Sequence, residues 1–179
     1  MKILLINGCE AGTMSYNNVA NQVAKDIQVN RNQIEVRATW LALIYDEMLR
    51  AGIKNTEEIL RKAITRYGTI KGEKIKNACA DPQDMRQFAD KTPSKTGQAT
   101  FNMDPVSSGY DDVHLSFKYC PLCEAWDKLG LDEQTRATLC DIAMDGDRGI
   151  AKAMGFELDI ADTIADGAAA CKLHYRKNK

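Results

Sequence analysis

Apolar residues in the last part of this chain recur at every second position, and this spacing constrains the fold more than any other feature of the sequence. Residues 113–119 alternate between apolar and polar side chains, and the same alternation returns over residues 156–161 and 171–176. A period of two is typical of a strand that buries one face. The last two segments flank a turn of small residues around Asp166 and Gly167, so they predict a hairpin.

Two helices are expected between the first of these strands and the hairpin. Apolar residues recur at helical spacing over residues 121–129 and 132–154, and Gly130 separates the two stretches. Pro121 occupies the favoured first position of a helix, and Asp132 is the expected cap of the second helix. A strand, two helices and a hairpin predict an antiparallel sheet of three or four strands with helices over one face.

The first half of the chain shows mainly helical spacing. Two helices are the simplest interpretation of residues 17–50, and a further helix is expected over residues 56–79 with Thr56 at its cap. Asp81 is expected to open a short helix, and later turns lead to a short strand over residues 98–103.

The fold class that follows is α+β. A helical N-terminal half over residues 1–91 acts as a scaffold and packs on a small antiparallel sheet with two helices, which occupies residues 98–177. A chain of 179 residues fits one domain, so residues 1–179 are expected to form a single unit.

The composition excludes several classes of protein. The chain has 24 Lys and Arg against 25 Asp and Glu and a pI near 6.1, which argues against a nucleic-acid partner. Its apolar runs are shorter than the ~18 residues of a membrane span, and residues 1–6 lack a signal-peptide pattern. We therefore expect a cytoplasmic protein with no membrane partner, whose ligand is a small molecule.

Charge is unevenly distributed along the chain. Residues 50–76 contain eight Lys or Arg and three acids, whereas residues 104–166 contain fourteen acids and five bases. The two regions are expected to attract each other. Few aromatic residues lie among the bases, so the basic stretch indicates a solvated helix face rather than a polyanion site.

Cys120 is the cysteine best placed for chemistry. It lies where the strand ends and Pro121 begins a helix, and the unpaired N–H groups of a helix start stabilise a thiolate. Two alternatives remain open at this point. Cys120 and Cys123 form a Cys-x-x-Cys pair suited to dithiol redox chemistry. With Cys140 and Cys171, they could also hold zinc or an iron–sulfur cluster.

The remaining cysteines are expected to be reduced, because cytoplasmic thiols rarely form disulfides. Cys140 falls on an apolar stripe and is expected to point inward, while Cys79 and Cys171 are expected to be small buried hydrophobes. Cys9 is a further free thiol in the N-terminal stretch.

Charged and imidazole side chains supply the other candidates. Asp141 and Asp145 are four residues apart on one helix face, and Arg148 follows at a distance that lets it neutralise them. This arrangement indicates either a surface ion-pair cluster or a site for a cationic group. His114 and His174 are expected on the polar face of the sheet, which collects the side chains His114, Lys118, Glu157, Asp159, Lys172 and His174.

The second half of the chain resembles the L-2-amino-thiazoline-4-carboxylate hydrolase family. The resemblance rests on the stretch from Cys120 to Leu131 with its Cys-Pro-Leu-Cys-Glu-Ala-Trp start, on Leu139-Cys140-Asp141, and on Asp166-Gly167 before the closing strand. It is clear over residues 110–177 and weaker over the helical half. The positions that the family motif marks are Cys120, Glu124, Cys140, Asp141, Gly167 and Cys171.

This resemblance implies a small bacterial hydrolase that adds water across the C=N bond of a cyclic amidine and opens the ring to an N-carbamoyl amino acid. Either the Cys120 thiolate attacks the ring carbon, or a carboxylate such as Glu124 or Asp141 activates water. The expected substrate-binding side chains are Cys140, Asp145, Arg148, Lys118 and His114. No cofactor and no metal ion are expected.

A second hypothesis comes from a different class of protein. The family is distantly similar to ligand-binding domains of the 4-vinyl reductase type, so the same pocket could belong to a non-catalytic small-molecule sensor. The polar sheet face and the helical half also leave surface for a homo-oligomer.

Overall fold

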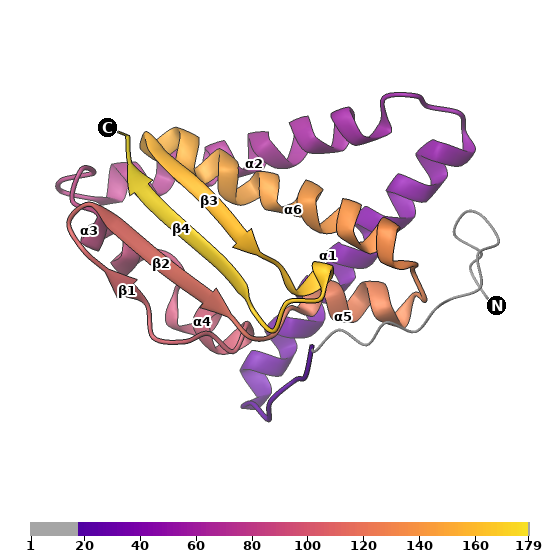
Figure 1. Ribbon diagram of the computed structural model, residues 1–179, viewed down its shortest axis with the longest axis horizontal. Helices are drawn as coiled ribbons and strands as arrows, with labels where there is room; N and C mark the ends of the chain where they lie inside the picture. Colours follow the sequence, from indigo (N-terminus) through magenta and orange to yellow (C-terminus); the bar gives the residue numbers. More distant parts are fainter. Residues whose placement is uncertain (1–17, 179) are drawn as a thin grey trace.

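The computed structural model describes residues 18–178, which form a four-stranded antiparallel sheet with helices packed over one face (Figure 1). The spatial order of the strands is β1, β2, β4, β3. Their bounds are Ser107–Ser108 for β1, Asp112–Phe117 for β2, Phe156–Asp162 for β3 and Cys171–Lys177 for β4. The α+β architecture and the strand number are therefore as the hydrophobic spacing predicts.

The two central strands carry the alternation most clearly. In β2 and β4, Val113 pairs with Tyr175 and Leu115 pairs with Leu173, and all four side chains are buried on the inner face. His114 pairs with His174 on the outer face. The C-terminal hairpin of β3 and β4 is confirmed.

The helices account for most of the described chain. Their bounds are Lys25–Arg50 for α1, Thr56–Ala78 for α2, Met85–Lys91 for α3, Lys95–Thr100 for α4, Pro121–Lys128 for α5 and Glu133–Met154 for α6; a single 3-10 turn, η1, spans Ile164–Asp166. None of the described helices is long and apolar enough to cross a membrane. Asp132 caps α6 as predicted, because its side chain accepts a hydrogen bond from the Thr135 N–H.

The prediction of two helices before residue 50 is wrong for the described part of that segment. Lys25–Arg50 is one uninterrupted helix, and its sequence contains neither glycine nor proline to break it. The helix ends at Arg50 with Ala51 as its C-cap, immediately before Gly52, which adopts a positive φ of 73°.

Three short-range predictions also need correction. Residues 98–103 do not form a strand, because Ser94 caps the short helix α4 by accepting a hydrogen bond from the Gly97 N–H. The helix expected at Asp81 begins at Met85, where the Asp84 side chain caps it. Thr56 is the first residue of α2 rather than its cap, and its hydroxyl donates to the Ile53 carbonyl.

Helices α2 and α6 approach closely because glycines line their contact. A Cβ added to Gly68 would collide with the backbone of Gly146, and one added to Gly149 would lie 2.5 Å from the Thr65 carbonyl oxygen. The basic helix therefore lies against the acidic one, as the uneven charge distribution predicts.

Helix α5 is fixed to α1 by its one tryptophan. Trp126 is completely buried, and its indole N–H donates to the Ala38 carbonyl oxygen at 3.0 Å. This hydrogen bond and the burial of the indole hold α5 against α1.

Candidate functional site

A pocket of about 390 Å³ lies between the inner face of the sheet and α6. Its volume falls within the roughly 300–1,000 Å³ that is usual for small-molecule sites, which are mostly apolar with a few polar groups. The apolar part of its wall consists of Phe88, Phe101, Leu115, Phe117, Leu122, Trp126, Ala143, Met144, Ile150 and Leu173.

Cys120 borders this pocket at the start of α5. It is the N-cap residue, with φ −129° and ψ 109°, and Pro121 begins the helix. Asn18 holds the Cys120 backbone from both sides: the Cys120 N–H donates to Asn18 Oδ1 at 2.8 Å, and Asn18 Nδ2 donates to the Cys120 carbonyl oxygen at 3.0 Å. These two hydrogen bonds fix the position of the nucleophile candidate.

The surroundings of Cys120 favour its thiolate. The Cys123 thiol donates a hydrogen bond to the Cys120 sulfur, and this contact lowers the pKa of Cys120. Burial opposes that shift, but the backbone N–H groups of Cys123 and Leu122 at the helix start support it. The same contact raises the pKa of Cys123 far above its ordinary value, so the negative charge of the pair belongs on Cys120.

Two further thiols line the pocket without sharing this activation. Cys140 and Cys171 are buried, as their apolar patterns predict. Burial raises the pKa of Cys140 and raises that of Cys171 to about 12. The Cys171 sulfur accepts a hydrogen bond from the Ile164 N–H at 3.2 Å. Both thiols therefore remain protonated at neutral pH.

The structure does not support a four-thiolate metal site. Within residues 18–178, the cysteines form no group whose sulfur atoms lie close enough together to hold one ion. The five described cysteines are free thiols, with Cys79 only half-buried and Cys9 outside the described residues.

A second set of polar groups borders the same pocket. The Tyr175 hydroxyl donates to Asp147 Oδ1 at 3.0 Å, and burial raises the pKa of the Asp147 carboxyl against this hydrogen bond. Lys71 and Lys91 are exposed at the edge of the pocket. Seven residues of α6, about 10 Å of helix, separate Asp147 from Cys140. The pocket is thus elongated, with thiols in one region and a polar group in another.

Asn18 and Asp147 were not identified from the sequence. Asn18 lies in an irregular segment that carries no periodic signal. Asp147 could have been identified from the helical spacing, because it occupies the next position after Cys140 and Met144 on the apolar stripe of α6. A charged residue on a buried stripe indicates either a buried ion pair or hydrogen-bonded pair, or a functional site.

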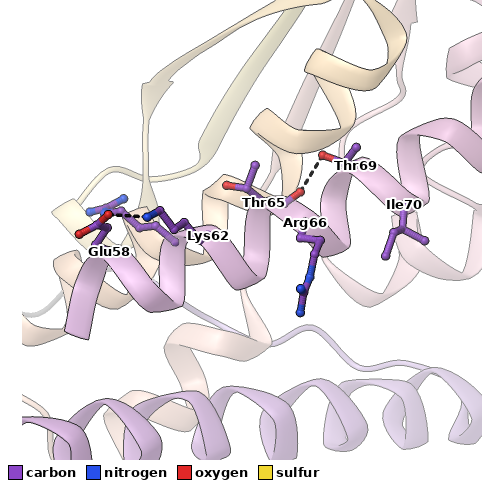
Figure 2. A pocket seen from close by; sticks show the side chains of 7 residues that line it. Glu58, Lys62, Thr65, Arg66, Thr69 and Ile70 are labelled. Carbon is purple, nitrogen blue, oxygen red and sulfur yellow. Dashed lines mark hydrogen bonds and ion pairs between the residues drawn. The ribbon is translucent and has the colours of Figure 1, made fainter. Parts of the chain in front are cut away.

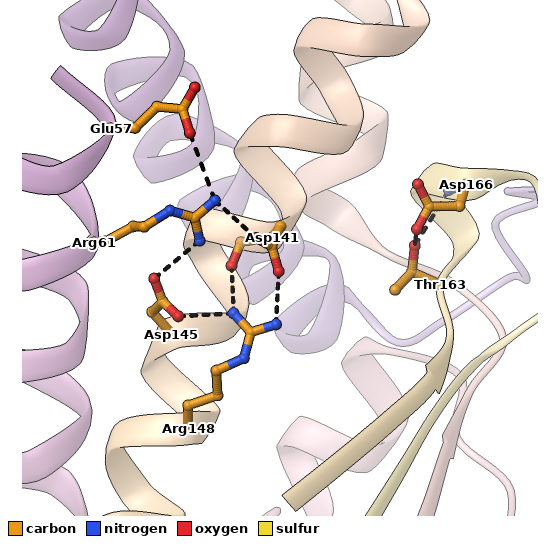
Figure 3. A network of polar contacts seen from close by, with 7 residues as sticks. All are labelled: Glu57, Arg61, Asp141, Asp145, Arg148, Thr163 and Asp166. Atoms are coloured by element: carbon orange, nitrogen blue, oxygen red, sulfur yellow. Dashed lines mark hydrogen bonds and ion pairs between the residues drawn. The ribbon is translucent and has the colours of Figure 1, made fainter. Parts of the chain in front are cut away.

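The carboxylates predicted for catalysis and binding on α6 lie outside this pocket (Figure 3). Arg148 contacts Asp141 at 2.6 Å and Asp145 at 2.7 Å, as the spacing predicts. Arg61 of α2 completes the network, with Asp141 at 2.7 Å and Asp145 at 3.2 Å. Two arginines therefore neutralise two carboxylates where the helices meet.

The other predicted side chains are also absent from the pocket lining. Glu124 pairs with Lys128 at 3.3 Å on α5, and Lys118 pairs with Asp104. His114 stacks on His174 on the outer face of the sheet. Of the eight predicted site residues, only Cys120 and Cys140 line the pocket. The catalytic and binding roles of all eight remain predictions.

A larger hollow of about 660 Å³ lies along α2 alone (Figure 2). It is lined by seven residues of this one helix: Glu58, Arg61, Lys62, Thr65, Arg66, Thr69 and Ile70. Glu58 and Lys62 pair across it at 2.5 Å. Because a single helix cannot enclose a ligand, this hollow is the solvated basic face that the sequence predicts.

Comparison with known proteins identifies both a family and a fold. The family model of L-2-amino-thiazoline-4-carboxylic acid hydrolase matches residues 31–175. No curated protein matches the chain significantly. Among solved structures, a trafficking protein particle complex subunit 3 from Naegleria fowleri, covalently bound to palmitic acid, gives a TM-score of 0.51 at 13% identity. The match covers 81% of this chain and 97% of that one, and at such low identity it shows likeness of fold alone.

Proposed function

The chain belongs to the L-2-amino-thiazoline-4-carboxylic acid hydrolase family, and we propose that it hydrolyses a small cyclic amidine in the pocket beneath the sheet. The product is the ring-opened N-carbamoyl amino acid. One observation carries this proposal: the cysteine with the lowered pKa borders an apolar pocket large enough for such a ring.

The charge of the pocket edge suits the acidic group of such a substrate. Lys71 and Lys91 supply two positive charges at this edge of the pocket. In L-2-amino-thiazoline-4-carboxylate, the carboxylate and the amidine carbon lie on opposite sides of the ring. A carboxylate held near the lysines therefore directs the amidine carbon inward, toward Cys120.

The reaction in this orientation begins with attack by the Cys120 thiolate on the amidine carbon. A bond forms between that carbon and the Cys120 sulfur, and the electrons of the C=N bond move to the ring nitrogen, which takes a proton. The bond from the carbon to the ring sulfur then breaks, and the released thiolate is protonated.

Water completes the reaction by attacking the same carbon and expelling the Cys120 thiolate. The oxygen of water becomes the carbonyl oxygen of the N-carbamoyl group. Its two protons are accounted for by the ring nitrogen and the released thiol. Helix α5 supports both steps, because its N-terminal N–H groups stabilise the thiolate before attack and after release.

The test is to incubate the purified protein with L-2-amino-thiazoline-4-carboxylate and detect N-carbamoyl-cysteine by mass spectrometry. We expect product from the wild type and a loss of kcat on the order of 10³-fold or more in Cys120→Ala. Cys79→Ala is the matched control, since Cys79 does not line the pocket. Full turnover by Cys120→Ala would refute the assignment of the nucleophile.

A second candidate function follows from the shape and lining of the pocket. An elongated apolar pocket with a thiolate at its wall also suits an acyl chain attached to Cys120 as a thioester, and the similar trafficking subunit is itself described as covalently bound to palmitic acid. In that case the protein is a binding domain without turnover. A hydroxylamine-labile adduct on Cys120 in freshly purified protein, together with no hydrolysis of any cyclic amidine, would favour this function.

A further inference from the structure

The outer face of the sheet carries two histidines and a carboxylate that lie close together. His114 of β2 and His174 of β4 are directly opposite each other in the strand register. Asp112 lies two residues before His114 on the same strand, and therefore on the same face. One ligand atom from each of the three side chains lies within 4.8 Å of the other two.

The separations match those between ligands of a tetrahedral metal ion. Asp112 Oδ2 lies 3.4 Å from His114 Nε2 and 3.6 Å from His174 Nε2. Around a zinc ion with bonds of ~2.0–2.1 Å, neighbouring ligand atoms in a tetrahedron are about 3.3–3.4 Å apart. The two measured distances are too long for strong hydrogen bonds but suit two ligands of one ion.

A buried nitrogen points to the same conclusion. The Nε2 atom of His174 has a solvent-accessible area below 1 Å² and no hydrogen-bond partner among the described residues. A buried polar atom without a partner is costly, and a metal ion would satisfy it.

The neighbouring charges do not oppose a cation. Lys172, two residues before His174, pairs with Asp162 at 2.8 Å, and Lys118 pairs with Asp104. Arg176 contacts both Glu157 and Asp159. The nearby basic groups are thus neutralised, and the carboxylate of Asp112 is left to face the two imidazoles.

We propose that Asp112, His114 and His174 form a site for a divalent transition metal ion of the zinc type. Two imidazoles and a carboxylate are a recurrent ligand set for zinc, and three protein ligands leave a fourth position for water or a small ligand. A shallow hollow of about 310 Å³ beside the histidines gives that position access to solvent.

Binding requires a small local rearrangement. The two imidazole rings are stacked, with centroids 3.9 Å apart and planes 13° apart, so their nitrogens do not yet converge on one point. Rotation about χ2 brings them to the ion, and this torsion is soft for histidine. Both side chains are partly exposed, at 53% for His114 and 32% for His174, which leaves room for that rotation.

This site is independent of the pocket reaction, because it occupies the opposite face of the sheet and shares no residue with the pocket lining. It also differs from the cysteine set considered from the sequence. A zinc requirement for folding is not implied, since the sheet register holds the three residues together.

The test measures zinc binding to the full chain without a histidine tag by isothermal titration calorimetry, with Co²⁺ absorption as a readout of tetrahedral geometry. We expect one ion per chain, and affinity that falls more than about tenfold in Asp112→Asn and about a hundredfold in His114→Ala and His174→Ala. Glu157→Gln, on the same face but outside the ligand set, is the matched control and should bind like the wild type.

Two results would overturn the proposal. One is the absence of zinc binding to the wild type. The other is binding that survives in the His114→Ala, His174→Ala double variant, above all if Cys120→Ala abolishes it. Because Asp112→Asn is nearly isosteric and Asp112 is only partly buried, the circular dichroism of this variant should match that of the wild type, so that a loss of affinity reports on the ligand rather than on folding.

Discussion

Cys120 is distinguished from the other described cysteines by its position rather than by its residue type. The helix start and the Cys123 thiol act on the Cys120 sulfur. The side chain of Asn18 holds the Cys120 backbone through two hydrogen bonds. The sequence predicts the helix start through Pro121, since that signal is local. It does not predict the two hydrogen bonds from Asn18, because Asn18 and Cys120 are far apart in the chain and meet only after folding.

The three thiols of the pocket should differ in reactivity. Iodoacetamide at pH 6 to 7 is expected to alkylate Cys120 before Cys140 and Cys171, because of these three thiols only Cys120 has a lowered pKa. Peptide mapping of briefly labelled protein gives the relative rates. Labelling of Cys171 at a rate equal to that of Cys120 would contradict the assigned thiolate.

The second prediction concerns Asp147, whose pKa is raised by burial. Because the folded state binds this proton more tightly than the unfolded state, the wild type loses stability as pH rises above the ordinary Asp range of about 4. Asp147→Asn removes that loss, so it should be more stable than the wild type at pH 7.5 and nearly equal at pH 4. Urea unfolding at the two pH values measures this, and a variant less stable at pH 7.5 would argue against a raised pKa.

At the scale of elements, the contact of α2 with α6 combines close packing and charge. Hydrophobic spacing predicts both helices with nearly correct bounds. It does not predict that Gly68 and Gly149 lie in the contact, because the sequence pattern shows a glycine inside a helix only as a residue of low helix propensity. Similarly, the short helix α4 replaces an expected strand because a single capping serine outweighs a weak alternation.

The close contact predicts different outcomes for two similar substitutions. Gly68→Ala should lower the free energy of unfolding by about 1–3 kcal/mol, because its Cβ meets the Gly146 backbone. Gly146→Ala should be neutral or slightly stabilising, because its Cβ would lie 3.6 Å from the nearest atom, Ile64 Cγ2. Thermal or urea unfolding of the two variants measures the difference, and equal effects would refute the close approach.

The arginine network predicts a pH dependence opposite in sign to that of Asp147. Burial disfavours the charged form of Asp141, but its hydrogen bonds to Arg148 and Arg61 outweigh this and lower its pKa. The stabilisation is present above the ordinary Asp range and is lost as pH falls through the lowered pKa. Asp141→Asn should therefore be less stable than the wild type at pH 7, by no more than about 1 kcal/mol for a half-exposed group, and the gap should close in acid. Loss of turnover without this change in stability would instead support a catalytic Asp141.

At the scale of the whole molecule, the fold class and the three longer strands could be predicted from alternation and helical spacing, because these patterns report directly on which faces are buried. The two-residue strand β1 is exposed and carries no such pattern. The pocket could not be predicted in the same way. Its wall combines residues from α2, α3, the α3–α4 turn, α4, the sheet, α5 and α6, and its volume depends on how these elements pack. For the same reason the sequence identified Cys120 and Cys140 but not Asp147.

The proposed reaction depends on attack by Cys120 on the amidine carbon of a ring bound in this pocket. It is tested most directly by mixing the protein with L-2-amino-thiazoline-4-carboxylate, quenching with acid within the first turnover, and mapping peptides by mass spectrometry. We expect an adduct of one substrate mass on the peptide that contains Cys120, and no adduct in Cys120→Ala, which should also lack turnover. Ring-opened product formed at the wild-type rate by Cys120→Ala, with no adduct on the wild type, would contradict it.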